Sequence, residues 1–265
     1  MNRVKPAVVL IVSIMVLTGC NLQTHMLYYP SPHLPSAAEL AAGSLSFWPS
    51  GPASYRGFIG TTEIGSAKGT VVVFHGNAGT AADRAYYVKP LGSIGYRVVL
   101  AEYPGYGQRG GQLGEKSFVE DAQATIRLIS ETYREPLFLL GESLGCAVAA
   151  GAAKDPGLRI DGIVLITPWD TLLAVAKSTF PWFPVGLLMK DKYDSVANLK
   201  SFRGRIAVVG AERDEILPIR HANALYQSLT GNKKIWTLKG AGHNDWLNVV
   251  DASKWREFMD FVDKG

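Results

Sequence analysis

Ser143 stands between two glycines in the stretch G-E-S-L-G (residues 141–145), directly after the apolar run LFLL and before the small-residue run CAVAAGAA. This pattern predicts a strand, a tight turn and a helix, with the serine side chain held above the edge of a sheet. Glycines two positions before and after the serine relieve crowding against the neighbouring strand and helix. We interpret Ser143 as a nucleophile; the alternative is a serine that only caps the helix.

A serine hydroxyl becomes a strong nucleophile when a histidine takes its proton and an acid orients that histidine. Of the five histidines, His243 is the candidate base because it lies late in the chain, in the glycine-rich turn K-G-A-G-H-N-D. We expect His75 to pack within its own loop. The remaining histidines are expected at the surface: His25, His33 and His221.

Asp214 is the candidate acid because it follows the apolar run IAVVG and precedes a helix that begins near Pro218. The order nucleophile, acid, histidine along the chain is the one expected for a serine on a strand-to-helix turn. Three other carboxylates compete: Asp170, Glu212 and Glu215. Asp170 is the strongest of them, since it follows the preceding strand and the sequence alone leaves that position open.

Two backbone amides should stabilise the oxyanion that forms when the serine attacks a carbonyl. The residue after the nucleophile, Leu144, supplies the first amide. The second is expected from the loop H-G-N-A-G, where Gly76 and Gly79 allow a close approach of the backbone to the substrate. Asn77 is our candidate for this donor, with Ala78 as the alternative.

Short apolar runs alternate with helical patterns along most of the chain. Continuous Val, Ile and Leu runs are typical of strands covered on both faces, which favours a mostly parallel sheet with crossover helices. Strands are predicted over residues 70–75, 96–103, 136–140, 162–166, 205–210 and 234–238, with antiparallel edge strands over 55–60 and around Phe47. Helices are predicted over residues 81–93, 116–132, 144–154, 218–229 and 245–263. The prediction is a single α/β domain over residues 46–265.

Residues 168–204 interrupt this alternation and contain the apolar stretch TFPWFPVGLLM. A long excursion at the strand ends usually covers or shapes a site. We expect a short cap-like insertion that favours acyl chains. The alternative is that these side chains only pack helices onto the sheet.

The N-terminus resembles a bacterial lipoprotein signal. Arg3 and Lys5 precede an apolar run of eleven residues, 7–17, which is too short to span a bilayer and has the length of a secretory signal. The run ends in L-T-G-C, a lipobox-like pattern in which Cys20 would carry the lipid. We predict a signal peptide over residues 1–19, a Pro-, Ser- and Ala-rich tether over 20–45, and a lipid-anchored protein facing the periplasm. Asn21 weakly favours the outer membrane.

The formal net charge of +4 comes from scattered Lys and Arg, without a basic run interleaved with aromatics, so a nucleic-acid partner is not expected. The stretch G-Y-G-Q-R-G (105–110) matches a dinucleotide-binding fingerprint, but further glycines precede the helix and Glu131 lies inside a helical pattern. We therefore expect no cofactor, and no metal-ligand spacing is present in the sequence. Cys146 is expected to be a buried apolar filler.

Four motifs stand in order: H-G-N-A-G (75–79), Y-P-G-Y-G (103–107), G-E-S-L-G (141–145), and the pair R-D (213–214) and G-H-N-D (242–245). Together they resemble the α/β-hydrolase superfamily over about residues 47–264. They are most similar to a serine-hydrolase branch that includes mammalian depalmitoylating enzymes and bacterial esterase- or peptidase-like members. The resemblance implies the α/β-hydrolase fold and the same nucleophile, acid, base and oxyanion donors.

The sequence thus predicts a serine hydrolase of carboxylic esters or thioesters, acting on a small-molecule or lipid acyl ester. Two alternatives stay open: a serine peptidase or amidase of the same fold, and a non-catalytic hydrolase-like lipoprotein that only binds a partner.

Overall fold

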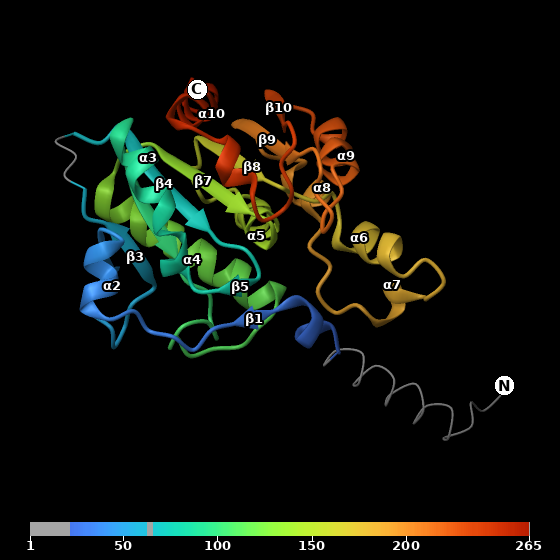
Figure 1. Cartoon of the computed structure of the whole chain (residues 1–265), viewed down its shortest axis with the longest axis horizontal. Coiled ribbons are helices and arrows are strands. Elements are labelled where there is room, and N and C mark those ends of the chain that lie inside the picture. Colours follow the sequence, from blue (N-terminus) through green and yellow to red (C-terminus); the bar gives the residue numbers. More distant parts are fainter. Residues whose placement is uncertain (1–21, 63–65, 265) are drawn as a thin grey trace.

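A twisted sheet forms the centre of the molecule in the computed structural model, which describes residues 22–62 and 66–264 (Figure 1). The predicted signal peptide (1–19) and Cys20 lie outside the described residues. The sheet has eight strands in the order β10-β9-β8-β7-β4-β6-β3-β2. The strands are β2 (Leu45–Trp48), β3 (Gly57–Gly60), β4 (Gly69–Phe74), β6 (Tyr96–Ala101), β7 (Leu137–Glu142), β8 (Gly162–Ile166), β9 (Arg205–Ala211) and β10 (Lys233–Leu238).

The strands from β10 to β6 run parallel, whereas β3 and β2 are antiparallel at one edge. Both predictions for the sheet are therefore confirmed. Strands β4 and β8 are buried along their whole length, because helices cover both faces. The carboxyl ends of these parallel strands meet at one edge, where loops can carry a site.

Helices cover the two faces of the sheet, as Figure 1 shows. The apolar cluster on one face includes residues of α4 (Glu115–Tyr133), α5 (Leu144–Ala152), α8 (Ser195–Leu199) and α9 (Arg220–Ser228). The cluster on the other face includes residues of the 3₁₀-helix η1 (Ala81–Tyr87), α3 (Val88–Ser93) and α10 (Ala252–Val262). Together the clusters fix the rigid body from which the loops at the carboxyl ends of the strands project.

Two predicted helices are each divided into two shorter ones. The helix predicted over residues 81–93 becomes η1, which has a kink inside it at Arg84, and α3, where Pro90 lies in the first turn and its missing amide is tolerated. The helix predicted over 245–263 becomes η2 (Trp246–Val249) and α10. Asp251 starts α10 anew, because its side chain accepts a hydrogen bond from the Lys254 amide at 2.9 Å.

The prediction of a tether over residues 20–45 is wrong for the described part of that segment. Residues 22–27 are helical, strand β1 (Tyr29–Pro30) pairs in parallel with β5 (Ala78–Gly79), and α2 (Ala37–Ala42) begins at a capping box formed by Ser36 and Glu39. Tyr28 is buried, and its hydroxyl donates to the Asp191 carboxylate at 2.6 Å. The composition suggested a linker, but single anchoring side chains fix the segment to the domain.

The insertion at residues 168–204 contains α6 (Leu172–Thr179), α7 (Val185–Leu188) and α8. Helix α8 packs on α5, whereas α6 and α7 project from the body beside the N-terminal segment (Figure 1). Within the described ranges, the structure has no helix long and apolar enough to cross a bilayer.

Candidate active site

The turn from β7 to α5 holds Ser143 in a strained backbone conformation, with φ 52° and ψ −115°. Both flanking glycines are required by sterics. A Cβ on Gly145 would lie 1.9 Å from the carbonyl oxygen of Phe74, and one on Gly141 would lie 2.5 Å from the Cys146 amide nitrogen. The pattern G-x-S-x-G therefore exists because β4, β7 and α5 approach too closely for side chains at those positions.

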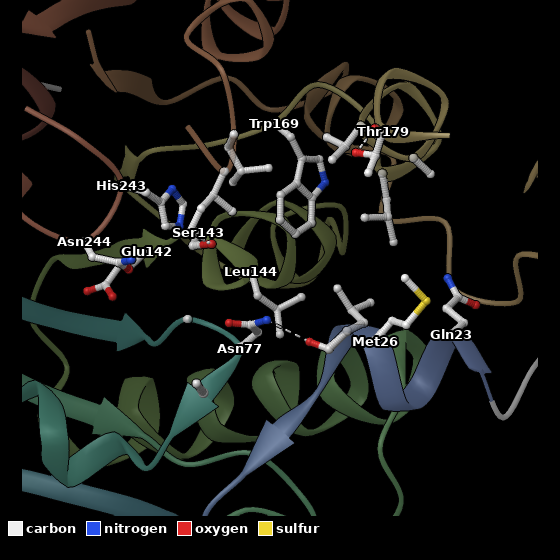
Figure 2. A pocket seen from close by; sticks show the side chains of 18 of the residues that line it. Gln23, Met26, Asn77, Glu142, Ser143, Leu144, Trp169, Thr179, His243 and Asn244 are labelled. Carbon is white, nitrogen blue, oxygen red and sulfur yellow. Dashed lines mark hydrogen bonds between the residues drawn. The ribbon is translucent and has the colours of Figure 1, made fainter. Parts of the chain in front are cut away.

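The structure brings Ser143, His243 and Asp214 together, although they lie far apart in the sequence. His243 Nδ1 donates to Asp214 Oδ2 at 2.8 Å, which leaves Nε2 facing Ser143 Oγ at 3.1 Å. The Asp214 side chain is only 1% exposed. Figure 2 shows the imidazole of His243 pointing at the serine hydroxyl. This geometry allows the histidine to take the serine proton and the aspartate to stabilise the resulting imidazolium.

The loop after β9 prepares the Asp214 carboxylate for this role. Its second oxygen, Oδ1, accepts hydrogen bonds from the backbone amides of Ile216 at 3.0 Å and Leu217 at 2.6 Å. These two bonds fix the rotation of the carboxylate, so that Oδ2 is directed at His243. The buried charge is thereby satisfied from three sides.

Asp170, the strongest rival for the acid, is engaged elsewhere. Its Oδ1 accepts a hydrogen bond from His221 Nδ1 at 2.8 Å. His221 was expected at the surface, but it is buried at the start of α9. The prediction for His221 is wrong because α9 turns this residue toward the sheet, where Asp170 at the end of β8 provides a partner. Asp170 thus pairs with His221, whereas Asp214 pairs with His243.

The two predicted oxyanion donors lie at the same end of the pocket as Ser143 (Figure 2). Leu144 is the first residue of α5, so its amide has no helical carbonyl to bond. The Asn77 amide makes no hydrogen bond to another described residue. The rest of Asn77 is fixed, because its side chain donates to the Leu27 carbonyl and its own carbonyl accepts from Tyr29 and Tyr106.

His75 is buried beneath this loop, as expected, and contacts the Gly76 carbonyl at 2.7 Å and the Glu102 carboxylate at 3.0 Å. Tyr103 donates to the His75 carbonyl at 2.7 Å. These contacts hold the loop H-G-N-A-G from below, which positions the Asn77 amide.

The sequence did not reveal the role of Glu142, the residue directly before the nucleophile. Its carboxylate accepts hydrogen bonds from Tyr86 and Tyr87, and Arg84 Nε lies 3.3 Å from it. Burial and, second, the charge of Glu142 raise the pKa of the Tyr86 hydroxyl above its usual range, so the hydroxyl remains a donor. A charged residue at the buried end of a strand, followed by a nucleophile, was the one available signal. The contacts of Glu142 with Tyr86, Tyr87 and Arg84 fix the backbone directly before the strained turn.

Ser143 and His243 line a pocket of about 960 Å³. Its lining is mostly apolar, and two of its walls come from elements far apart in the sequence, the insertion and the helical segment 22–27 (Figure 2). The insertion contributes Trp169, Leu172, Val175, Phe180, Phe183 and Leu188, and the N-terminal segment contributes Leu22, Gln23, Met26 and Leu27. The prediction that the insertion shapes the site is consistent with this lining, whereas the N-terminal wall was not predicted.

Comparisons with known proteins agree with this architecture. A family model described as serine aminopeptidase, S33, matches residues 65–187. The chain is 29% identical over 246 residues to an uncharacterized protein of Mycobacterium tuberculosis, covering 90% of this chain and 86% of that protein. It is 28% identical over 193 residues to the lysophosphatidylserine lipase ABHD12 of Danio rerio, covering 63% of this chain and half of that lipase.

Among solved structures, an esterase of Pyrococcus furiosus superposes with a TM-score of 0.67 at 18% identity. The match covers 89% of this chain and 99% of the esterase. At this level of identity the likeness shows the fold, which is the α/β-hydrolase fold. The strand order, with the serine turn, the acid loop and the histidine loop at the carboxyl ends of the strands, shows that this protein has the α/β-hydrolase fold, and its relatives support a place in the α/β-hydrolase superfamily.

Proposed function

We propose that this protein is a serine hydrolase that cleaves carboxylic esters or thioesters through an acyl-Ser143 intermediate. The observation that carries the proposal is the continuous hydrogen-bonded relay from Ser143 Oγ through His243 to Asp214, with distances of 3.1 and 2.8 Å. Such a relay turns a weak hydroxyl nucleophile into a reactive one.

In the first half of the reaction, His243 Nε2 takes the Ser143 proton while Oγ attacks the carbonyl carbon. The negative charge moves to the carbonyl oxygen, where the amides of Leu144 and Asn77 stabilise it. His243 then gives the proton to the departing alcohol or thiol, and the acyl group stays on Ser143. A water molecule, deprotonated by His243, attacks the acyl-enzyme, and the acid leaves as Ser143 regains its proton.

The substrate class follows from the pocket. Its apolar walls suit an acyl chain, and a volume of about 960 Å³ is ample for a lipid ester. The similarity to a lysophosphatidylserine lipase and the shared fold with an esterase support a lipid or ester substrate.

Peptide hydrolysis is the second candidate, since the matching family model carries the description of an aminopeptidase. An aminopeptidase needs an acidic group to bind the free amino terminus of its substrate. Among the described residues that line the pocket, Glu142 is the one carboxylate, and Tyr86, Tyr87 and Arg84 already engage it. This arrangement favours esters over amino-terminal peptides.

We also propose that Cys20 carries a lipid that anchors the protein to the bacterial cell envelope, facing the periplasm. The support is the sequence pattern of residues 3–20 alone. Replacing Cys20 with Ser should abolish metabolic labelling of the protein by a radioactive fatty acid, and labelling that persists in the variant would contradict the proposal.

Hydrolysis of p-nitrophenyl esters from acetate to decanoate tests the proposed activity. Ser143→Ala should abolish turnover, and Ser50→Ala, at an exposed position, serves as the matched control. We expect the rate to rise with chain length as the apolar pocket fills. Equal rates across the series would contradict the acyl pocket, and full activity of Ser143→Ala would contradict the mechanism. Preferential cleavage of aminoacyl anilides would favour the peptidase instead.

A further inference from the structure

Large apolar side chains gather at the surface around the mouth of the pocket. We define the mouth face by six exposed residues: Leu22, Met26, Phe180, Trp182, Phe183 and Leu187. Four of them line the pocket, and Trp182 and Leu187 flank them in the insertion. Trp182 is 97% and Leu187 82% exposed, so the protein itself provides no cover for them within the described ranges. An exposed apolar cluster of this kind marks an interaction site.

Specific contacts hold the two halves of the mouth face together. The Gln23 side chain donates to the Asp191 carbonyl at 2.7 Å and accepts from the amides of Lys190 and Asp191 at 2.8 and 3.0 Å. The Tyr28 hydroxyl adds its bond to the Asp191 carboxylate. Figure 1 shows the N-terminal segment and the α6–α7 region on the same side of the molecule. The mouth face is therefore one connected surface, built from the N-terminal segment and the insertion.

The charged side chains of the insertion segment that carries the mouth face are lysines, and Glu115 of α4 lies beside them, where its carboxylate accepts a hydrogen bond from the Lys192 amide. Residues 171–190 contain two charged side chains, Lys177 and Lys190, and both are exposed, as is the following Lys192. The adjacent Asp191 is buried, and its carboxylate accepts a hydrogen bond from the Tyr28 hydroxyl, so it is not exposed at the surface of this face. Aromatic side chains beside exposed lysines are typical of surfaces that insert at the boundary between headgroups and acyl chains of an anionic membrane.

The start of the described chain lies on the same face. Leu22 is two residues after Cys20, the predicted lipid attachment site. An anchor attached there would hold the mouth face close to a bilayer and raise its local concentration at the lipid surface. The anchor would not bring a second copy of this chain to the mouth face. Two mouth faces packed together would also place the lysines of one copy against those of the other.

We propose that the mouth face docks on a phospholipid bilayer with anionic headgroups, with Trp182 and Leu187 inserted at the headgroup boundary. The pocket then opens toward the lipid, so that an acyl ester enters from the membrane without crossing water. Docking itself needs no hydrolysis; only the entry of substrate rests on the proposed function.

Trp182 is a native reporter for this proposal, because the other five tryptophans are buried. The experiment uses the full chain with Ser143→Ala, so that the vesicles stay intact. Vesicles of phosphatidylcholine and phosphatidylglycerol carry bromine on their acyl chains, which quenches a tryptophan that reaches them. We expect a blue shift and quenching of the emission, both lost in Trp182→Phe. Vesicles of phosphatidylcholine alone should quench less.

Leu187→Ser tests whether the Leu187 side chain also enters the headgroup boundary. Val249→Ser is the control at an exposed apolar position that does not line the pocket. The first variant should lose most of the quenching, and the control should keep it. Equal quenching in Trp182→Phe, or no quenching of vesicle-bound protein, would overturn the proposal. A blue shift that grows with protein concentration without lipid would overturn it in favour of self-association.

A second readout separates docking from hydrolysis. In chains that retain Ser143, Leu187→Ser should cleave a soluble acetate ester normally but a vesicle-borne ester at least about tenfold more slowly. Loss of both activities would contradict docking as the cause, and the quenching result stands whether or not the protein hydrolyses esters.

Discussion

The aspartate that pairs with His243 is determined by single side chains and their immediate neighbours. The sequence left Asp214 and Asp170 both open, because each follows a strand at the same edge of the sheet. Only the folded loops separate them: two backbone amides turn the Asp214 carboxylate toward His243, whereas Asp170 is paired with His221. A contact across more than fifty residues leaves no trace in the local pattern, so sequence reasoning could not choose.

Replacing either aspartate with asparagine tests this assignment. Asp214→Asn keeps the shape but loses the charge that stabilises the imidazolium, so kcat/KM should fall roughly 10³- to 10⁴-fold. Asp170→Asn should lower kcat/KM less than about tenfold, because its partner His221 does not contact the nucleophile. Steady-state kinetics on a p-nitrophenyl ester measures both. A larger loss in Asp170→Asn would assign the acid to the end of β8.

At the scale of elements, the packing of α5 against β4 and β7 is the tightest constraint on the site. Gly145 allows the first turn of α5 to lie directly against the end of β4, where a methyl group would meet a backbone oxygen. A backbone atom cannot rotate away as a side chain can. The nucleophile turn therefore depends on a close contact between three elements, and its disruption should affect both folding and catalysis.

Gly145→Ala should destabilise the protein by roughly 3 kcal/mol or more, because the added Cβ overlaps the Phe74 carbonyl oxygen. Gly110→Ala is the matched control, since its Cβ would meet no atom within 4 Å. Thermal unfolding followed by circular dichroism compares the two variants. A stable, fully active Gly145→Ala would mean that α5 and β4 are not packed as described.

The contact between α10 and β10 predicts that the stability of the folded protein depends on pH. Hydrogen bonds from the Trp236 indole and the Lys254 ammonium lower the pKa of Glu257 to about 2. Because the folded-state pKa lies below the usual value of 4.5, the stabilisation is present above pH 4.5 and is lost as the pH falls toward 2. Glu257 is partly exposed, so the effect should be less than about 1 kcal/mol.

Glu257→Gln should therefore be less stable than the natural protein at neutral pH, and this difference should shrink below pH 4.5 and disappear as the pH falls through 2. Glu131→Gln, on the exposed side of α4, should show no such crossover. Urea unfolding at several pH values measures both differences. A constant gap between Glu257→Gln and the natural protein across this range would contradict the lowered pKa.

The elements that could be predicted are those with a repeating local signal. The continuous apolar runs of β4, β7, β8 and β9 gave their positions, and the glycines at 141 and 145 gave the turn, because burial on both faces and steric crowding act on neighbouring residues. The kink inside η1 and the new start of α10 were missed, since a kink and a cap depend on one or two residues. Segment 22–45 was missed because its anchors, such as Gln23 and Tyr28, bind residues more than 160 positions away.

At the scale of the whole molecule, two walls of the pocket, the N-terminal segment and the insertion, hold each other in place. The N-terminal segment crosses the carboxyl end of the sheet, pairs with the oxyanion loop through β1 and β5, and bonds to the insertion at Asp191. The Asn77 side chain connects the same segment to the site through the Leu27 carbonyl at 3.0 Å. A change in this segment should therefore alter both stability and catalysis.

Tyr28→Phe removes the hydroxyl that donates to the buried Asp191 carboxylate. We expect a loss of about 1–3 kcal/mol in the free energy of unfolding, together with slower hydrolysis of long-chain esters. The neighbouring Tyr29→Phe is the control, because the Tyr29 hydroxyl bonds at the surface. Chemical denaturation and ester kinetics measure both effects. Equal stability of the two variants would show that the segment is not held at Asp191.

The proposed hydrolase activity depends on Ser143 being an activated nucleophile, and a fluorophosphonate probe tests this most directly. Intact-protein mass spectrometry and peptide mapping should find one probe molecule on Ser143 in the folded protein. Labelling should be strongly reduced in His243→Ala and absent after denaturation, because the hydroxyl is reactive only beside the histidine. A folded protein that leaves Ser143 unlabelled, or that carries the probe equally in Ser143→Ala, would contradict the account.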